Sequence, residues 1–407
     1  MRGITMKVQL VSLAAILSLA SYSANAKEFI LTDVEKGIAK GDWSISSQDL
    51  GVKEHKFTIQ NTVLKGGKQD GTELLTIASD NLTIKLIPTR GLGILSVDGD
   101  DIRLGWDSPV DEVVNPKYIN LESRGGLGWL DGFNELMVRC GFEWTGHAVQ
   151  ADGMIYTLHG RAQNTPVSRL IVNVLDKAPY TITVRGLIKE NTFKKSNLET
   201  WVSLSYVPGS KDFIVHDVVT NKSDYTRDYQ IIYHSNYGTP ILEEGARFVA
   251  PVKEISPFND YAKKGLKTWQ TYLGPTKDFD EMVFNVYPYA DEQGQTQVMV
   301  TNQAGDKGAG ISFNTNQLPV FSLWKNTDTL KQGYVTGLEP GTSFAYPVTI
   351  EREQKRVRQL EPGQSTEFTL VYSLLSDKQA VEQYEAQIKS IQGDQETKVV
   401  ERPMAKE

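Results

Sequence analysis

The 407-residue sequence has a single cysteine, Cys140, so no disulfide bond can form within the chain. A chain of this length does not need one, because a large hydrophobic core can hold it together. No Cys/His pairing signature accompanies Cys140, and we expect a packed, inert thiol there. The sequence also lacks a phosphate-binding glycine loop, a zinc-ligand spacing and a dinucleotide fingerprint. We therefore expect neither a metal ion nor another cofactor.

Positive charge is scarce and scattered. The chain has 43 Lys and Arg against 50 Asp and Glu, a formal net charge of -7, and no basic block. This balance argues against nucleic acid as a partner. There is also no Pro/Ser-rich linker and no repeat at the periods of solenoids or propellers, which favours a single domain in spite of the length.

Long hydrophobic runs are confined to the start of the chain. Arg2 and Lys7 precede an apolar run over residues 8–20, and small residues follow at 24–26. This pattern is typical of a secretory signal peptide, with an uncleaved membrane anchor as the alternative. We therefore assign residues 1–26 to a signal peptide, 27–393 to one domain and 394–407 to a disordered tail. The mature protein is expected to be exported, most simply to the periplasm, with no membrane span.

Most of the remaining chain predicts β-strands. Apolar side chains alternate with polar ones at three places: Leu82, Ile84 and Leu86; Phe213, Val215 and Val219; Phe368, Leu370 and Tyr372. Further strands are expected over residues 180–187, 201–207, 229–233, 297–301, 310–313 and 344–350. Many short strands without intervening helices indicate an all-β fold, a large antiparallel β-sandwich.

One helix is predicted near the end of the chain. Ser376 and Gln379 have the spacing of a capping box, Val381, Tyr384 and Ile388 form an apolar stripe, and Gly393 is placed to end the helix. Residues 107–153 differ from both patterns. They are rich in glycine and tryptophan, show little alternation, and predict a long ordered loop with a functional role.

Three polar residues stand beside glycine or a turn at the ends of expected strands. His159 precedes Gly160-Arg161, His234 ends a strand and precedes Ser235-Asn236-Tyr237-Gly238, and Glu339 precedes Pro340-Gly341. Side chains in such positions are exposed to whatever binds above a sheet. Of the other histidines, His216 alternates within an apolar strand and is expected to be structural, whereas His147 lies in the Trp-rich loop.

Three short stretches in this order resemble the signatures of the aldose 1-epimerase (galactose mutarotase-like) superfamily. They are Leu158-His159-Gly160, Tyr233-His234-Ser235-Asn236-Tyr237 and Gly337-Leu338-Glu339-Pro340. The longer string from Leu318 to Asn326 is more similar to a poorly characterised bacterial branch than to the galactose enzymes. The resemblance covers about residues 82–375 and implies a β-supersandwich that binds a sugar on one sheet.

The resemblance also implies roles for the three residues. Glu339 would take the proton of the anomeric hydroxyl, His234 would protonate the ring oxygen, and His159 would steady that end of the sugar. Opening a cyclic hemiacetal requires both proton transfers, after which the ring closes on its other face. A carboxylate can accept a proton near neutral pH, and a histidine with a pKa of about 6.5 can donate one.

A sugar site also needs groups that bind hydroxyls and an apolar surface. Candidates for substrate binding are Arg161, Arg90, Arg247 and His147, with Trp324 or Trp129 stacking on a sugar face. Three arginines around one cleft would suit an acidic sugar. The sequence thus predicts an exported aldose 1-epimerase-like isomerase acting on a small carbohydrate. The alternatives are another sugar epimerase or a lyase on the same fold, or a carbohydrate-binding protein without catalysis.

Overall fold

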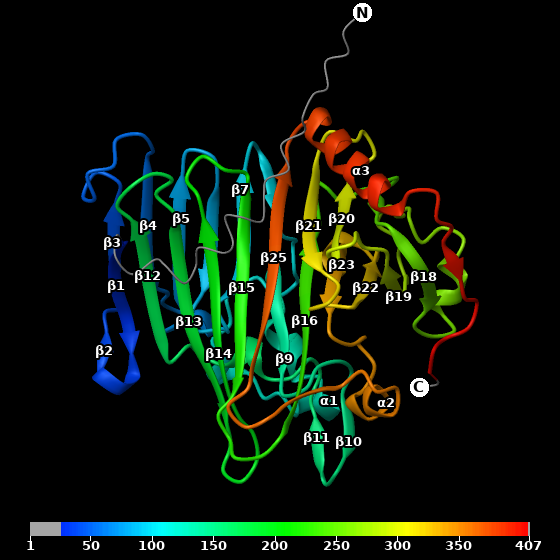
Figure 1. Ribbon diagram of the computed structural model, residues 1–407, viewed down its shortest axis with the longest axis horizontal. Coiled ribbons are helices and arrows are strands. Elements are labelled where there is room, and N and C mark those ends of the chain that lie inside the picture. Colours follow the sequence, from blue (N-terminus) through cyan, green and yellow to red (C-terminus); the bar gives the residue numbers. More distant parts are fainter. Residues whose placement is uncertain (1–25, 406–407) are drawn as a thin grey trace, which may run out of the picture.

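The computed structural model describes residues 26–405, which form two large β-sheets packed face to face (Figure 1). Neighbouring strands run antiparallel in both sheets, except for one short parallel pair at an edge. The predicted antiparallel sandwich with a C-terminal helix is thus confirmed. Of the predicted signal peptide, residues 1–25 lie outside the described residues.

The smaller sheet has ten strands and faces the viewer in Figure 1. Their spatial order is β17 (Arg247–Val249), β20 (Gln295–Thr301), β21 (Gly308–Asn314), β25 (Ser365–Leu375), β15 (Asp212–Asn221), β14 (Asn197–Tyr206), β13 (Ile182–Asn191), β12 (Arg169–Leu175), β1 (Ala26–Asp33) and β2 (Ile38–Ala39).

The larger sheet has fourteen strands. Twelve follow one another in the order β26 (Lys398–Val399), β18 (Val252–Pro257), β19 (Met282–Pro288), β22 (Val320–Asn326), β23 (Val335–Gly341), β16 (Arg227–Tyr237), β9 (Met137–Phe142), β7 (Gly93–Gly99), β6 (Thr83–Ile87), β5 (Glu73–Ser79), β4 (Phe57–Val63) and β3 (Trp43–Ser46). The other two are β24 (Arg358–Leu360), beside β16, and β8 (Ile102–Leu104), beside β7. A separate hairpin consists of β10 (Val149–Ala151) and β11 (Met154–Tyr156).

Helices are few and short, apart from one. The α-helices are α1 (Ser123–Gly126), α2 (Val348–Glu353) and α3 (Lys378–Gln392), and the 3-10 turns are η3 (Val34–Lys36), η4 (Gly67–Gln69), η5 (Pro116–Tyr118), η6 (Gly128–Gly132), η7 (Ala162–Asn164), η8 (Ala262–Gly265) and η9 (Leu330–Gln332).

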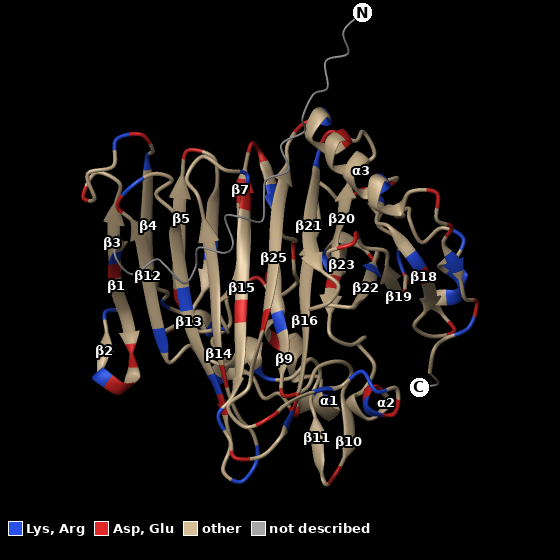
Figure 2. Cartoon of the chain, in the orientation of Figure 1, with Lys and Arg blue, Asp and Glu red and all other residues tan. Residues whose placement is uncertain are grey.

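The main core fills the space between the two sheets, because each strand buries every second side chain there. Ile84 and Leu86 of β6 and Val215 and Leu370 of the facing sheet belong to one apolar cluster, which is the burial that the alternation predicted. Charged residues gather mainly at turns, strand ends and the helices (Figure 2). The sandwich therefore has an apolar interior between two wide sheets.

A buried ion pair joins the sheets through this core. Arg139 of β9 donates two hydrogen bonds to Asp217 of β15, at 2.6 and 2.9 Å, and Asp217 also accepts from the Tyr233 hydroxyl at 2.9 Å. Arg139 also donates to the carbonyl of Leu92. The ion pair is buried and bidentate, and so Arg139 fixes β9 to β15 of the opposite sheet. Tyr233 fixes β16 to the same carboxylate.

The larger sheet is also covered on its outer face. A second apolar cluster there includes Trp106, which immediately precedes the Trp-rich loop, and Trp129 and Phe133 from within it. Phe344 and Tyr346 from the segment before α2 belong to the same cluster. The loop predicted over residues 107–153 contains β9, which showed no alternation because both of its faces are buried. The strand predicted over residues 344–350 is wrong, since the chain leaves the sheet there and enters α2 at Val348.

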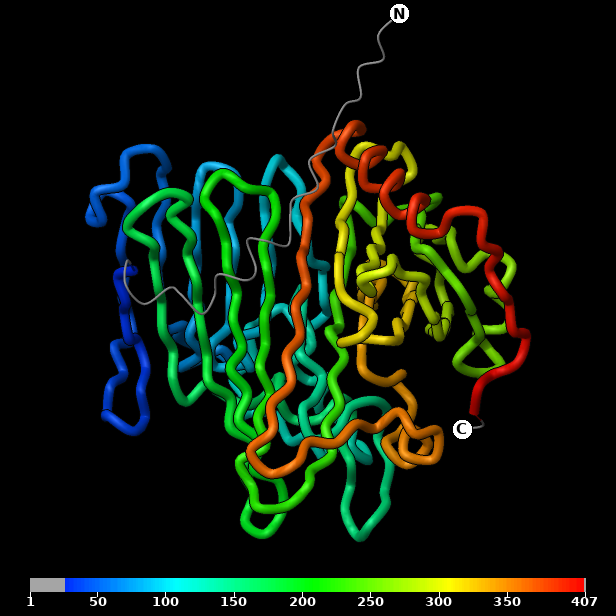
Figure 3. Tube along the Cα trace, viewed as in Figure 1, coloured from blue at the N-terminus to red at the C-terminus, as the bar shows by residue number. Residues whose placement is uncertain are grey.

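The C-terminal region differs from its prediction in two ways. Helix α3 exists as expected and buries Val381, Tyr384 and Ile388, but its N-cap is Asp377, whose carboxylate accepts from the backbone N–H of Ala380 at 2.8 Å. The segment from residue 394, expected to be disordered, instead continues down the edge of the larger sheet (Figure 3), where β26 pairs with β18. Backbone pairing offsets the polar composition of this segment.

Candidate active site

His234 and Glu339 lie on neighbouring strands at the same level of the larger sheet. The register between β16 and β23 pairs Ser235 with Leu338 and Ile232 with Gly341, which places His234 beside Glu339. Both side chains point to the outer face, because Tyr233 and Leu338 next to them face the main core. His234 Nε2 lies 3.2 Å from Glu339 Oε1. The sheet itself thus sets the distance between the predicted acid and base.

Aromatic rings surround this pair. The ring centroid of His234 lies 5.4 Å from that of Phe133, 5.3 Å from Trp324 and 6.1 Å from Trp129. His234 and Glu339 are only 5% and 3% exposed. The pair is therefore held in a site of low polarity, where charges interact more strongly than in water.

Asn236 fixes the orientation of His234. These residues are two apart on a strand and share a face, and Asn236 Oδ1 lies 2.7 Å from His234 Nδ1. The amide nitrogen of Asn236 donates to the carbonyls of Glu135 and His234, so its oxygen must be the acceptor. His234 therefore carries a proton on Nδ1 and turns Nε2 toward Glu339.

Burial changes the protonation of both members of the pair. It lowers the pKa of His234 to about 4, against a smaller opposing effect of the hydrogen bond with Asn236. Burial also raises the pKa of Glu339 well above its usual value, and the negative charge of Glu281 adds to this. Both shifts disfavour charge in the closed site, so they favour a proton on Glu339 beside an uncharged His234. Moving that proton to His234 produces the carboxylate and imidazolium that hemiacetal opening requires.

His159 joins the pair from a loop between β11 and η7. Its ring centroid lies 5.4 Å from that of His234 and 4.8 Å from that of Trp129. Its backbone has a left-handed φ of 57°, uncommon for histidine, and Gly160 follows with φ 75°. A Cβ on Gly160 would collide with the carbonyl oxygen of Trp144, so the turn that follows His159 requires glycine at this position.

The side chain of His159 has capacity for a ligand. Its Nδ1 is buried and has no hydrogen-bond partner among the described residues. Burial, followed by the nearby His234 and His147, lowers the pKa of His159 well below its usual value. An uncharged imidazole with an open nitrogen can exchange hydrogen bonds with a sugar oxygen.

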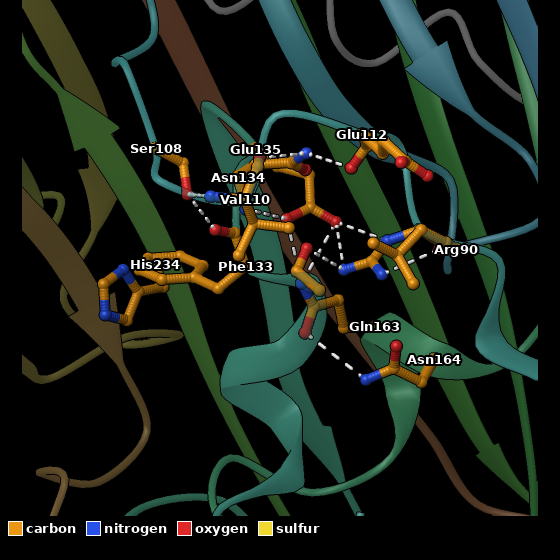
Figure 4. Close-up of polar contacts among 12 residues, drawn as sticks. Arg90, Ser108, Val110, Glu112, Phe133, Asn134, Glu135, Gln163, Asn164 and His234 are labelled. Carbon is orange, nitrogen blue, oxygen red and sulfur yellow. Dashed lines mark hydrogen bonds and ion pairs between the residues drawn. The ribbon is translucent and has the colours of Figure 1, made fainter. Parts of the chain in front are cut away.

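Arg90 supports the site without pointing into it. Its guanidinium is fully buried and donates to Glu135 at 2.8 Å and to the carbonyls of Val114 and Gly132, and Gln163 also donates to Glu135 (Figure 4). The backbone carbonyl of Glu135 in turn accepts from Asn236. Arg90 therefore holds the segment that orients Asn236 and, through it, His234.

The other two arginines lie elsewhere. Arg161 stacks over Trp144 at 5.1 Å and donates to Glu143 at 2.9 Å. Arg247 belongs to β17 of the opposite sheet and pairs with Glu385 of α3 at 3.2 Å. The structure thus does not gather the three arginines around one cleft, because two of them serve loops or the other sheet.

Two further predicted residues lie near the pair. Trp324 of β22 lines it directly and donates its indole N–H to the carboxylate of Glu281 at 2.7 Å. His147 is close enough to His159 to affect its pKa, and its ring lies 4.9 Å from Phe258. Trp129, proposed as an alternative stacking residue, packs on His159 from η6.

Sequence reasoning missed the residues that position the site. Asn236 lies in the His234 motif and Glu135 in the Trp-rich loop, but neither was singled out. For Asn236 the available signal was its two-residue spacing from His234, which puts both side chains on one face of a strand. Phe133 gave no signal. The described residues also offer neither a cluster of metal ligands nor a membrane-spanning helix. Residues 26–405 include no group of three or more His, Cys, Asp or Glu arranged to hold a metal ion. None of the helices in this range is long and apolar enough to cross a membrane.

Comparison with known proteins agrees with this fold. The chain is 65% identical to a Klebsiella pneumoniae subsp. pneumoniae protein for which aldose 1-epimerase activity has been proposed; the match covers 94% of this chain and 100% of that one, with a TM-score of 0.93. A galactose mutarotase-like protein of Clostridium acetobutylicum shares the fold at 14% identity and a TM-score of 0.51, over 82% and 99% of the two chains. No curated protein matches.

The fold is that of the galactose mutarotase-like β-sandwich proteins. A family described as a domain of unknown function, DUF4432, matches residues 69–374. The chain belongs to this family.

Proposed function

We propose that the protein is an aldose 1-epimerase-like isomerase that interconverts the anomers of a sugar by general acid/base ring opening. The observation that carries this proposal is the 3.2 Å approach of His234 Nε2 to Glu339 Oε1 in a buried site. In the proposed resting state the pair shares one transferable proton, which is the number that the reaction needs; the opposite shifts of the two pKa values support this state. The similarity to the Klebsiella protein supports the same reaction class.

The proposed cycle begins when a sugar enters between the aromatic rings. Polar sugar groups and the substrate's own dipoles favour the charged form of the pair, in which His234 holds the proton on Nε2. Glu339 then takes the proton of the anomeric hydroxyl while His234 protonates the ring oxygen. The open aldehyde turns about its C1–C2 bond, and the two transfers run backwards to close the ring on the other face. His159 exchanges a hydrogen bond with a sugar oxygen, and Trp324 packs against the ring.

Replacement of the base tests this proposal. The rate of α/β exchange is measured by NMR exchange spectroscopy on neutral aldoses, deoxy sugars and uronic acids, for the parent protein and for Glu339→Gln. Loss of a general base should slow exchange about 10²-fold or more while the isosteric amide preserves packing. Acceleration that survives in Glu339→Gln, or no acceleration of any sugar by the parent protein, would contradict the proposal. In the second case, sugar-induced chemical shifts would favour a binding protein.

We further propose that the chain is exported and acts in the periplasm. The support is the basic, apolar and small-residue pattern of residues 1–26. Cell fractionation and the N-terminal mass of the purified protein test this. A mature chain beginning at Lys27 in the periplasmic fraction is expected, whereas an intact N-terminus in the cytoplasm would refute it.

A further inference from the structure

A row of polar side chains crosses five adjacent strands on the outer face of the larger sheet. Ser256 of β18 pairs with Asn285 of β19, Asn285 with Ser322 of β22, and Ser322 with Glu339 of β23. His234 of β16 completes the row beside Glu339. These strands lie side by side in the right half of Figure 1. With strands about 4.8 Å apart, the row extends roughly 14 Å from Glu339 to Ser256, which is longer than one sugar ring.

Three residues of this row, Ser256, Asn285 and Ser322, each bury a polar atom that has no partner among the described residues. Ser256 and Asn285 are 0% exposed and Ser322 is 1% exposed. Among the described residues, Ser256 Oγ, Asn285 Oδ1 and Ser322 Oγ have no hydrogen-bond partner, whereas Glu339 Oε1 faces His234 Nε2. A buried polar atom without a partner is costly. Other buried polar atoms without a partner occur in the described residues, but these three occupy directly paired positions on three adjacent strands, in line with Glu339. We read this alignment as a surface built to meet another molecule.

Apolar side chains border the row on both sides. The register places Phe258, Val283 and Trp324 along one side, and Tyr287 and Val320 along the other. All five belong to the second apolar cluster or pack against it. A polar strip between apolar walls suits a saccharide, whose hydroxyl groups and C–H faces alternate around each ring.

The charges near the row select against an acidic ligand. Glu281 lies close enough to Glu339 to raise its pKa, so the negative charge of Glu281 reaches this end of the row. The guanidinium that approaches the row from the side of Tyr287 is that of Arg356, and it is already held by both carboxylate oxygens of Glu351, at 2.6 and 2.8 Å. The carboxylate of a sugar acid would thus meet like charge without an open cation.

We propose that Ser256, Asn285 and Ser322 form a second subsite, which binds the non-reducing unit of a neutral di- or oligosaccharide. The inference rests on the proposed function only in placing the reducing unit over His234 and Glu339. Tyr346 now covers part of the subsite, since its hydroxyl accepts from Asn285 Nδ2 at 3.1 Å and donates to the carbonyl of Phe258 at 2.8 Å. The ligand uses the open Oδ1 of Asn285. Its access requires Tyr346 to move, together with Met404 and Ala405, which pack against the same cluster and contact Tyr346.

Calorimetric titration with anomerically equilibrated sugars tests the subsite. An equilibrated sugar undergoes no net conversion, so the heat reports binding alone. The probes are glucose and galactose, their neutral disaccharides maltose, cellobiose and lactose, and glucuronic acid. At least one disaccharide should bind the parent protein ten times more tightly than either monosaccharide, and glucuronic acid should bind most weakly. Ser322→Ala should weaken that disaccharide about threefold to tenfold, the value of one hydrogen bond, while leaving monosaccharide binding unchanged.

Ser312→Ala is the matched control, because Ser312 lies on β21 of the opposite sheet and already pairs with the Tyr384 hydroxyl at 3.0 Å. It should bind all sugars like the parent protein. Thermal unfolding verifies that both variants fold, and the parent protein's order of affinities stands without any variant. Disaccharides that bind no better than monosaccharides, tighter binding of glucuronic acid, or unchanged binding by Ser322→Ala would overturn the subsite. Tighter disaccharide binding that Ser322→Ala weakens, without any acceleration of anomer exchange, would refute the proposed function alone. Accelerated anomer exchange with no higher affinity for disaccharides than for monosaccharides would refute this inference alone.

Discussion

Gly337 provides the sharpest perturbation of the proposed reaction. It lies two residues before Glu339 on β23, opposite Trp324, on the outer face of the sheet. A Cβ on Gly337 would lie 2.5 Å from Glu339 Oε1, 3.1 Å from Trp324 Cε3 and 3.2 Å from His234 Cε1. Its φ is not left-handed, so the backbone tolerates alanine. In Gly337→Ala the new methyl group therefore enters the space between the acid, the base and the aromatic wall.

The size of the effect follows from these distances. Ordinary contact with a Cβ begins at 3.4 Å, so the Glu339 carboxyl group has to retreat by about 0.9 Å. A misplacement of about 1 Å costs on the order of 10²-fold in rate. The methyl group otherwise meets side-chain atoms that can shift, so the free energy of unfolding should fall by only about 1–3 kcal/mol.

The assay is NMR anomer exchange on a sugar that the parent protein accelerates, combined with thermal unfolding. Gly274→Ala serves as the control, since its added Cβ would meet only the exposed side chain of Glu244, at 3.3 Å. It should match the parent protein in both measurements. Full anomer exchange by folded Gly337→Ala would mean that the reacting group is not between Glu339 and His234, and the reasoning would fail.

Three further outcomes are expected. The rate of exchange should fall as the pH drops toward about 4, where the pair takes up a second proton on His234. It should fall again as the pH rises through the raised pKa of Glu339, where the pair loses its proton. A rate that follows one ordinary carboxylate would contradict this expectation. Asn236→Leu should lower kcat about 10²-fold and move the acid limb to lower pH, because the lost hydrogen bond had raised the pKa of His234; an unchanged pH profile would give Asn236 a structural role only. Asp217→Asn should reduce the free energy of unfolding, measured by chemical denaturation, by about 3–5 kcal/mol, because Arg139 is left buried without its counter-charge. The control is Asp100→Asn, at the exposed ion pair with Lys211, which should change this free energy by less than about 1 kcal/mol.

The sequence by itself determined the class of fold. Alternation at Ile84 and Leu86, and at Phe213 and Val215, follows from strands that bury one face, and the structure confirms that these side chains lie in the core between the sheets. The apolar stripe of Val381, Tyr384 and Ile388 likewise predicted helix α3 correctly. The failures lie where both faces are covered: β9 is buried throughout and shows no period, and the aromatic residues before α2 alternate without forming a strand.

The motif order also indicated His159, His234 and Glu339, which the structure brings together. Only tertiary structure could decide the rest. The register between β16 and β23 sets the distance from acid to base, and burial shifts the pKa values of both groups. Arg90 was predicted to bind the sugar, but its contact with Glu135 makes it a support for Asn236 instead. The polar row of Ser256, Asn285 and Ser322 arises from pairing among strands whose residues lie up to 66 positions apart. Local patterns record which face of a strand is buried, but neighbours across a sheet are chosen by the packing of the whole chain.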